Sequence, residues 1–121
     1  MSLAEKKCVP CTGGVPALTR NEIAPLLKEL NNWTVENDKK LIRSFKFDNF
    51  AKPMRLAKKI AEIAEHEQHH PDLLVRWGEL KVDLWTHKID GLTESDFILA
   101  AKIDRCALLD GTCKVGASEK N

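Results

Sequence analysis

The sequence lacks the features that would direct the protein to a membrane or to a nucleic acid. No apolar run approaches the roughly 20 residues that a membrane-spanning helix needs. The 19 basic and 18 acidic residues nearly cancel, which leaves a formal net charge of +1 and no general attraction to a polyanion. The first seven residues, MSLAEKK, do not form the apolar core of a signal peptide. We therefore expect no membrane, no nucleic-acid partner and a cytoplasmic location.

Cysteine is scarce and poorly arranged for a metal site. Cys8 and Cys11 have zinc-knuckle spacing, but no second Cys-x-x-Cys follows them. A reduced N-terminal arm is therefore favoured over a metal or redox site. Cys106 lies in an apolar helical pattern, where cysteine behaves as a small hydrophobic residue, and Cys113 lies close to the C-terminus.

The length of 121 residues suits one domain with one modest core. Glycine and proline recur near the N-terminus, so residues 1–17 are expected to form a flexible arm without regular structure. A single domain is expected over residues 18–111, followed by a tail over residues 112–121. We find no internal repeat from which to argue.

Three segments have helical patterns. Thr19 and Glu22 predict a capping box for a helix that ends near Leu30, although Pro25 would bend this helix or delay its start. The third helix is predicted to follow the cap residue Thr93 and to run to about Leu109. The second helix, after Asp48 or Asn49, has an apolar stripe with helical spacing, made of Phe50, Met54, Ala57, Ala61 and Ala64 with Ile60 beside them.

Two segments predict β-hairpins. Residues 33–47 alternate around a turn at Asn37 and Asp38, and the strand at 41–47 is apolar on both faces, so it is expected to pair as an exposed edge with another chain. Residues 72–85 alternate around a turn that we place at Gly78 and Glu79.

This second turn sets a register that has consequences for the histidines. Trp77 faces Leu80 on the core side, and the same register, extended outward, pairs His70 with His87. The order α-β-β-α-β-β-α predicts an α+β fold, a two-layer sandwich in which three helices cover one face of a four-stranded antiparallel sheet.

Three of the four histidines lie in one stretch, EHEQHHP, at residues 65–71. From His66 the stretch matches the zinc-protease motif His-Glu-x-x-His, which needs both histidines on one face of a continuous helix. Pro71 disfavours helical geometry for the preceding residue, so the helix should end before His70. We therefore disfavour catalytic zinc. A structural site made only of His69, His70 and His87 stays open.

Proton transfer is the chemistry that this cluster favours. A histidine side chain titrates at about pH 6.5, so it donates or accepts protons readily near neutrality. Glu65 lies one helical turn before His69, where it can orient that side chain. No serine or cysteine is paired with the cluster as a nucleophile. An elimination, a hydration or an isomerisation is therefore indicated, and the alternative is a group of solvated histidines without a role.

The spacing of these residues resembles the signature of the pterin-4a-carbinolamine dehydratases. That signature combines an acidic or basic residue, a His-His-Pro, an aromatic residue, a histidine and an aspartate at set intervals. The matching positions over residues 18–110 are Glu65, His69, His70, Pro71, Trp77, His87 and Asp96.

The resemblance implies dehydration of 4a-hydroxytetrahydropterin to quinonoid dihydropterin, in the recycling of tetrahydropterin after aromatic amino acid hydroxylation, with no metal or organic cofactor. It implies His69 and His87 as the acid/base pair, with His70 positioning the pterin and assisting. Glu65 would orient a histidine or bind the substrate. The other matching positions that would face the substrate are Pro71 and Asp96.

Several alternatives stay open at this point. Asp96 at the third position of a capped helix is also explained by capping alone. We expect Trp77 to pack in the core and Thr86 to point to the apolar side. The family also contains partner proteins that stabilise dimers of a transcription factor, so a non-catalytic binding role or a role in molybdopterin metabolism remains. We expect a homodimer or a homotetramer.

Overall fold

The computed structural model describes residues 3–8 and 16–110 of the chain. Two 3-10 turns, η1 and η2, accompany three helices and four strands, in the predicted order α-β-β-α-β-β-α. The elements are η1 (Leu3–Glu5), α1 (Arg20–Leu27), β1 (Thr34–Glu36), β2 (Lys40–Lys46), α2 (Ala51–Glu67), β3 (Asp72–Arg76), β4 (Glu79–Leu84), η2 (His87–Ile89) and α3 (Glu94–Asp110).

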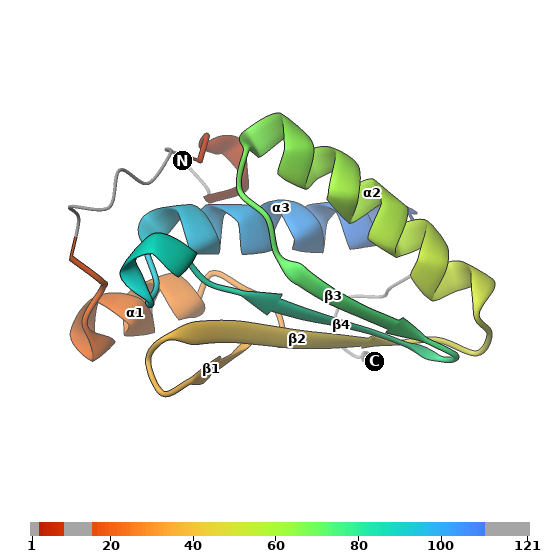
Figure 1. The fold of residues 1–121 in the computed structure, drawn as a ribbon, viewed down its shortest axis with the longest axis horizontal. Coiled ribbons are helices and arrows are strands. Elements are labelled where there is room, and N and C mark those ends of the chain that lie inside the picture. The colour runs from red at the N-terminus through yellow and green to blue at the C-terminus, as the bar shows by residue number, and fades with distance from the viewer. Residues whose placement is uncertain (1–2, 9–15, 111–121) are drawn as a thin grey trace.

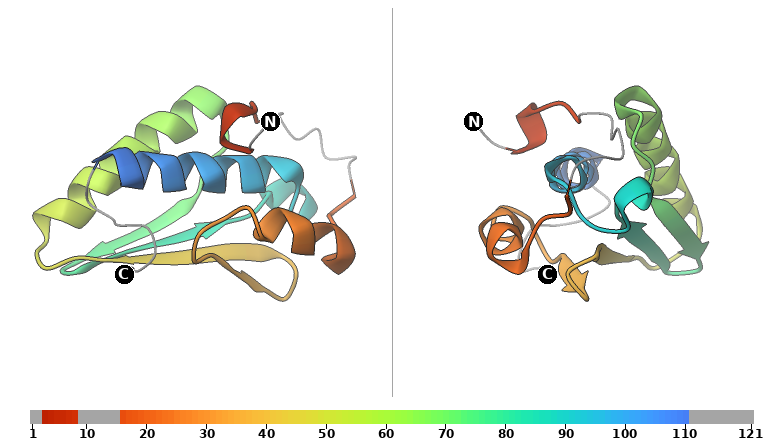
Figure 2. Two further views of the ribbon diagram at one scale, coloured as in Figure 1. Left: turned by 180° about the vertical axis from the view of Figure 1, so that it is seen from behind. Right: turned by 60° about the vertical axis from the view of Figure 1, so that its left-hand side comes forward.

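The four strands form one antiparallel sheet in the order β1-β2-β4-β3. Helices α2 and α3 lie over one face of this sheet, and α1 lies beside α3 (Figures 1 and 2). The predicted α+β class is therefore confirmed. The expectation that residues 41–47 form an exposed edge is wrong, because β2 lies between β1 and β4, and β1 and β3 form the edges.

The core lies between the sheet and the helices. Successive side chains of each strand point to opposite faces of the sheet, so one face carries apolar residues toward the helices. Side chains less than 2% exposed include Leu41, Phe45, Leu56, Ile60, Leu80, Val82, Leu84, Leu92, Phe97, Leu99 and Ile103. No helix among the described residues is long and apolar enough to span a membrane.

The local capping signals were predicted well. Thr19 and Glu22 form both halves of the capping box of α1. The helix holds Pro25 without a later start and ends at Leu27, earlier than predicted. The turn between β1 and β2 uses Asn37 and Asp38, both with positive φ.

The predicted apolar face of α2 was partly wrong. Phe50 and Met54 are 49% and 47% exposed, and Ala61 is exposed as well. The residues that α2 buries are Pro53, Leu56, Ile60 and Ala64. The buried face is therefore rotated toward Leu56 and Ile60, which belong to the hydrophobic core.

The turn of the β3–β4 hairpin lies one residue earlier than predicted, so the partner of each paired residue changes by two. Arg76 pairs with Glu79, so Trp77 and Gly78 are the loop residues. Gly78 has a φ of +78°, a left-handed conformation that glycine adopts without a Cβ penalty. Trp77 therefore projects from the turn and is 68% exposed, which corrects its expected place in the core against Leu80.

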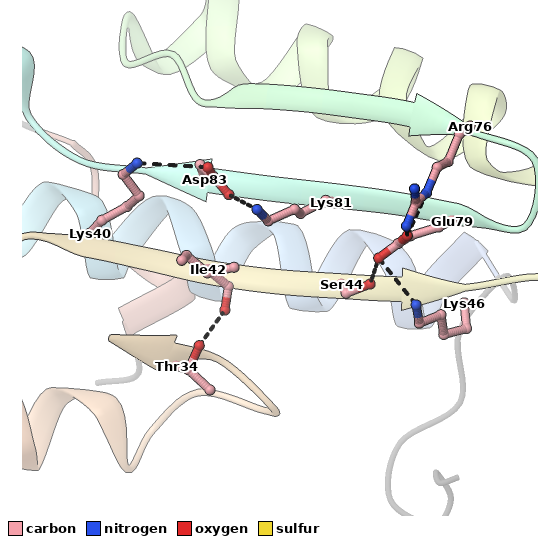
Figure 3. Close-up of polar contacts among 9 residues, drawn as sticks. All are labelled: Thr34, Lys40, Ile42, Ser44, Lys46, Arg76, Glu79, Lys81 and Asp83. Carbon is pink, nitrogen blue, oxygen red and sulfur yellow. Dashed lines mark hydrogen bonds and ion pairs between the residues drawn. The ribbon is translucent and has the colours of Figure 1, made fainter. Parts of the chain in front are cut away.

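The solvent-facing side of the sheet carries a charged cluster across three strands (Figure 3). The Glu79 carboxylate accepts hydrogen bonds from Ser44 of β2 and from Arg76 of β3. Lys46 lies 3.1 Å from the same carboxylate. Glu79 is only 8% exposed although it faces away from the core.

The N-terminal residues differ from the arm that was expected over 1–17. Leu3–Glu5 form η1, and Leu3 is 3% exposed within the hydrophobic core. Ala4 and Cys8 also pack against that core. Residues 3–5 of the expected arm thus form a short turn that packs against the core. Cys11, Cys113 and the tail expected over 112–121 lie outside the described residues.

Candidate active site

The histidine stretch begins on α2 and leaves it at a sharp helix end. Helix α2 ends at Glu67, and Gln68 follows with a φ of +54°. The backbone N–H of His69 still closes the helix by donating to Ala64 O over 3.1 Å. The helix therefore ends before His70, as predicted, and His66 and His70 do not share a helix face.

The side chain of His69 contacts a fully buried carboxylate on another element. His69 Nε2 lies 2.5 Å from Asp96 Oδ1, and Asp96 is 0% exposed. Asp96 Oδ2 accepts hydrogen bonds from Thr86 Oγ1 at 2.8 Å and from the Thr93 N–H at 2.9 Å. Asp96 thus caps α3 and also holds His69, so capping alone does not describe all its contacts.

His70 has a different carboxylate partner. Its Nε2 lies 2.6 Å from Glu65 Oε2, and both side chains are more than half exposed. The expectation that Glu65 orients His69 is therefore not met, because Glu65 contacts His70. Pro71 follows His70 and directly precedes β3.

His87 lies in η2, directly after Thr86. Its ring contacts the Trp85 ring with centroids 4.2 Å apart, and Lys40 Nζ lies 4.6 Å from the Trp85 centroid. The observed register, extended outward from the Asp72–Asp83 pair, places His69 opposite Thr86 and His70 opposite Trp85. Thr86, the residue before His87, and His69 both bind the Asp96 carboxylate, and the partner positions differ from those predicted. That His87 lies beside the two other histidines stays a prediction.

Thr86 is a site residue that the sequence analysis left out. Alternation placed it on the apolar side, and it is indeed buried, at 3% exposure. Its hydroxyl nevertheless has a polar task, because it donates to Asp96. The available signal was its position beside His87, at the end of a strand that approaches the histidine stretch.

The two carboxylates determine which nitrogen of each ring carries a proton. A carboxylate that is ionised can only accept a hydrogen bond, and its histidine partner then carries the proton on Nε2. Nδ1 of each ring is then left with a lone pair that can accept a proton. An ionised Asp96 also stabilises the imidazolium that His69 would become. This arrangement suits proton transfer.

The geometry does not favour a metal centre in the part of the chain that the structure describes. Within residues 3–8 and 16–110, no group of three or more His, Cys, Asp or Glu side chains is arranged to hold an ion. Each Nε2 of His69 and His70 faces a carboxylate instead.

Comparisons with known proteins agree with the fold and with the residue pattern. The family model for pterin 4 alpha carbinolamine dehydratase matches residues 16–106. A relative from Rickettsia bellii, named provisionally as a pterin-4-alpha-carbinolamine dehydratase, is 59% identical over 104 residues, covering 85% of this chain and 92% of the relative. A similarly named relative from Rubrobacter xylanophilus is 50% identical over 103 residues, covering 85% and 96%.

Solved structures show the same fold. A transcriptional coactivator/pterin dehydratase from Brucella melitensis has a TM-score of 0.70 and 33% identity, covering 75% of this chain and 98% of that one. A pterin dehydratase-like protein described as a RuBisCO assembly factor has a TM-score of 0.54 at 19% identity, a likeness of fold alone. With most of the chain matched by the family model and by relatives of such high identity, this protein belongs to the pterin 4 alpha carbinolamine dehydratase family.

Proposed function

We propose that this protein dehydrates 4a-hydroxytetrahydropterin to quinonoid dihydropterin by histidine acid/base catalysis, in tetrahydropterin recycling. The observation that carries the proposal is the contact of His69 with the fully buried Asp96, which also accepts a hydrogen bond from Thr86, the residue before His87. A buried carboxylate that fixes a ring and leaves its second nitrogen available is the arrangement that a general base needs.

The reaction breaks the C4a–O and N5–H bonds and forms a double bond between N5 and C4a. The C4a–O bond breaks as the hydroxyl is protonated and leaves as water, while N5 loses its proton and its electron pair forms the N5–C4a double bond. We assign the N5 proton to His69, because Asp96 stabilises the resulting imidazolium. His87, whose ring contacts that of Trp85 at a tilt of 49°, is then assigned the protonation of the leaving hydroxyl.

His70 is assigned a supporting role. Its contact with Glu65 fixes its ring at the exposed side of the corner, where it can bind the pterin and assist proton transfer. Glu65 would act through His70 or bind the pterin itself. Pro71 would line the corner beside the substrate.

A dehydratase assay on 4a-hydroxytetrahydropterin tests the proposal. We expect His69→Ala and His87→Ala each to lower kcat by about 10²-fold or more, the usual effect of losing a general acid or base. His66→Ala is the matched control, since His66 lies in the same stretch with a 75% exposed side chain. It should lose less than about threefold. Folding of each variant is checked by circular dichroism.

Two results would contradict the proposal. Turnover close to wild type in both His69→Ala and His87→Ala would remove the assigned acid/base pair. Activity of the unaltered protein that disappears with a chelator and returns with added metal would show that a metal, rather than the histidines alone, carries the chemistry.

We also propose that the protein forms a homodimer or a homotetramer. The edge strand β3 presents Leu74, which is 53% exposed, and the adjacent turn presents Trp77. An unpaired strand edge with apolar side chains is a usual site of association between chains. Analytical ultracentrifugation measures the state directly, and a monomer at micromolar concentration would overturn this part.

A non-catalytic role in binding a partner protein is the second candidate. The Brucella melitensis relative is described as a transcriptional coactivator as well as a pterin dehydratase. The exposed apolar side chains of β3 and its turn are the observation that favours such a role here. A protein that binds a pterin but does not turn it over would favour this candidate.

A further inference from the structure

A segment outside the matched family region contacts both elements that carry the His69–Asp96 pair. Residues 3–8, which we name the N-terminal strap, precede the matched residues 16–106. The strap lies against α3 and close to the C-terminal end of α2 (Figures 1 and 2). It is therefore near the two helix ends from which the site is built.

The first half of the strap is anchored on α3. Leu3 is buried in the core, with 3% exposure. Lys102 Nζ of α3 donates to Ala4 O at 2.9 Å, and Lys6 Nζ lies 2.9 Å from Glu94 Oε2. One apolar contact and two polar contacts thus fix the course of the strap before it reaches Cys8.

Cys8 links the end of α2 to the beginning of α3. Its N–H donates to Glu67 Oε1 at 3.0 Å, and its Sγ donates to Ser95 O at 3.5 Å. Glu67 is the last residue of α2, two positions before His69, and Ser95 directly precedes Asp96. One residue of the strap therefore contacts the immediate neighbours of both members of the pair.

The electrostatic state of these groups favours both contacts at neutral pH. Burial alone would raise the pKa of Glu67, but the Cys8 N–H hydrogen bond and the nearby His66 and Lys102 outweigh burial and lower it. Glu67 is thus an ionised acceptor, which strengthens the bond from Cys8. Burial, with the nearby Glu67 charge, raises the pKa of the Cys8 thiol to about 12, so the thiol keeps its proton.

We propose that the N-terminal strap is a positioning device for proton transfer. By holding Glu67 and Ser95, Cys8 fixes the separation of the α2 end and the α3 start, and with it the contact between His69 Nε2 and Asp96 Oδ1. The kinetic consequence rests on the proposed function, because misplacing a catalytic group by about 1 Å can lower a rate by about 10²-fold. The geometric consequence does not depend on the activity.

Substitutions at Cys8 separate its two contacts. Cys8→Pro removes both the N–H bound by Glu67 and the thiol, without changing the residues of α2 or α3, whereas Cys8→Ala keeps that N–H and removes only the thiol. The difference between the two variants therefore reports the hydrogen bond to Glu67. We expect Cys8→Pro to lower kcat about tenfold while KM changes less than about twofold. Cys8→Ala should lower kcat less. The control is Lys7→Ala, an exposed strap residue, which should behave like the unaltered protein.

A second measurement reports the geometry without the reaction. In long-range 1H–15N NMR spectra, the His69 Nε2 proton should give a resonance typical of a short hydrogen bond to a carboxylate. We expect this resonance to weaken or shift in Cys8→Pro and to stay in Lys7→Ala. If Cys8→Pro does not fold, Glu67→Ala is measured in its place, because it removes the same hydrogen bond from the α2 side.

The outcomes distinguish this proposal from the proposed function. An inactive wild-type protein would contradict the dehydratase assignment, and the NMR measurement would still decide the role of the strap. An active wild-type protein with unchanged kcat and an unchanged His69 resonance in a folded Cys8→Pro or Glu67→Ala variant would overturn the positioning role. A lower melting temperature alone would then show that the strap only stabilises the fold.

Discussion

Asp96 performs two tasks with its two oxygen atoms. Oδ2 accepts the Thr93 N–H at the start of α3 and the Thr86 hydroxyl, and Oδ1 contacts His69. The first task fixes the carboxylate rigidly, and the second uses that rigidity to orient an imidazole. Because Asp96 is fully buried, water does not compete for either oxygen.

We predict that Asp96→Asn lowers kcat by about 10²-fold or more while the protein stays folded. The Asn oxygen can still accept from Thr86 and Thr93, which turns the amide NH2 toward His69. A donor at that position forces Nε2 to become the acceptor, so the proton moves to Nδ1. The lone pair then lies on Nε2, beside residue 96, and Nδ1 can no longer accept a proton from the substrate. Steady-state kinetics and the His69 tautomer by 15N NMR measure both effects.

Thr86→Val is the control for Asp96→Asn. It removes one hydrogen bond to Asp96 but leaves the carboxylate opposite His69. We expect a smaller loss of kcat than for Asp96→Asn and an unchanged His69 tautomer. A wild-type kcat in Asp96→Asn would show that the contact with His69 has no part in turnover.

At the scale of single residues, the sequence predicted which side chains gather and was less successful with their partners. Spacing along the chain brought Glu65 within one helical turn of His69. The left-handed Gln68 then turns the chain, so Glu65 contacts His70 instead. Alternation correctly buried Thr86, but burial does not exclude a polar task when the neighbouring helix supplies a carboxylate.

Among the elements, the sheet is held at its hairpin end by Glu79. The carboxylate joins β4 to Ser44 and Lys46 of β2 and to Arg76 of β3 (Figure 3). The hydrogen bond from Ser44, then those from Arg76 and Lys46, lower the pKa of Glu79 from 4.5 to about 2. The ionised form is therefore favoured in the folded state.

We predict that Glu79→Gln destabilises the fold at pH 7 by about 2 kcal/mol, the scale of hydrogen bonds to a charged group. A carboxyl with a lowered pKa contributes stability that is fully present above its ordinary value of 4.5 and is lost as the pH falls toward about 2. The difference in unfolding free energy between wild type and Glu79→Gln should therefore close over that interval. Urea denaturation at several pH values measures it.

Asp48→Asn is the control for Glu79→Gln. Asp48 forms an ion pair with Lys52 at 3.2 Å, but its side chain is 81% exposed. Exposed ion pairs contribute little, so we expect a change below about 0.5 kcal/mol at any pH. A constant difference between wild type and Glu79→Gln from pH 7 to pH 2 would contradict the role assigned to the ionised carboxylate.

The same hairpin shows why sequence predicts faces better than registers. Gly78 was expected at the first loop position and lies at the second, which moves every predicted pair of β3 and β4 by two residues. Side chains alternate with a period of two, so this shift keeps each residue on its predicted face. The core face was therefore correct, whereas Trp77 left the core because it became a loop residue.

For the molecule as a whole, one buried ion pair joins distant parts of the chain. Arg43 Nη1 of β2 lies 2.6 Å from Asp104 Oδ1 of α3, and both side chains are less than 10% exposed. Asp104 also accepts from Trp33 Nε1 at 2.8 Å and from the Asn31 N–H at 3.1 Å. The loop before β1, the sheet and α3 therefore meet at one carboxylate.

Burial raises the pKa of Asp104 despite these donors, so desolvation outweighs the attraction of Arg43. We predict that Asp104→Leu costs about 3 kcal/mol or more, because it removes the carboxylate that compensates the buried Arg43 charge. The double variant Arg43→Met/Asp104→Leu should recover part of this loss, because it removes the buried Arg43 charge together with the Asp104 carboxylate that compensates it. Thermal and urea unfolding measure both variants.

A double variant that is no more stable than Asp104→Leu would contradict this account. The loss would then come from the Trp33 and Asn31 hydrogen bonds, which both variants remove. The pair was not predicted from the sequence, because β2 and α3 lie some sixty residues apart and nothing local connects them.

Under the proposed function, the end of α2 would couple helix fraying to reactivity. The His69 N–H is a closing bond of α2, and the His69 side chain is the one that Asp96 holds. Terminal turns of helices open far more readily than whole domains unfold. Opening this turn would withdraw the imidazole from its carboxylate, so the population of competent molecules follows a local equilibrium. On warming, turnover should therefore begin to fail while the rest of the molecule is still native.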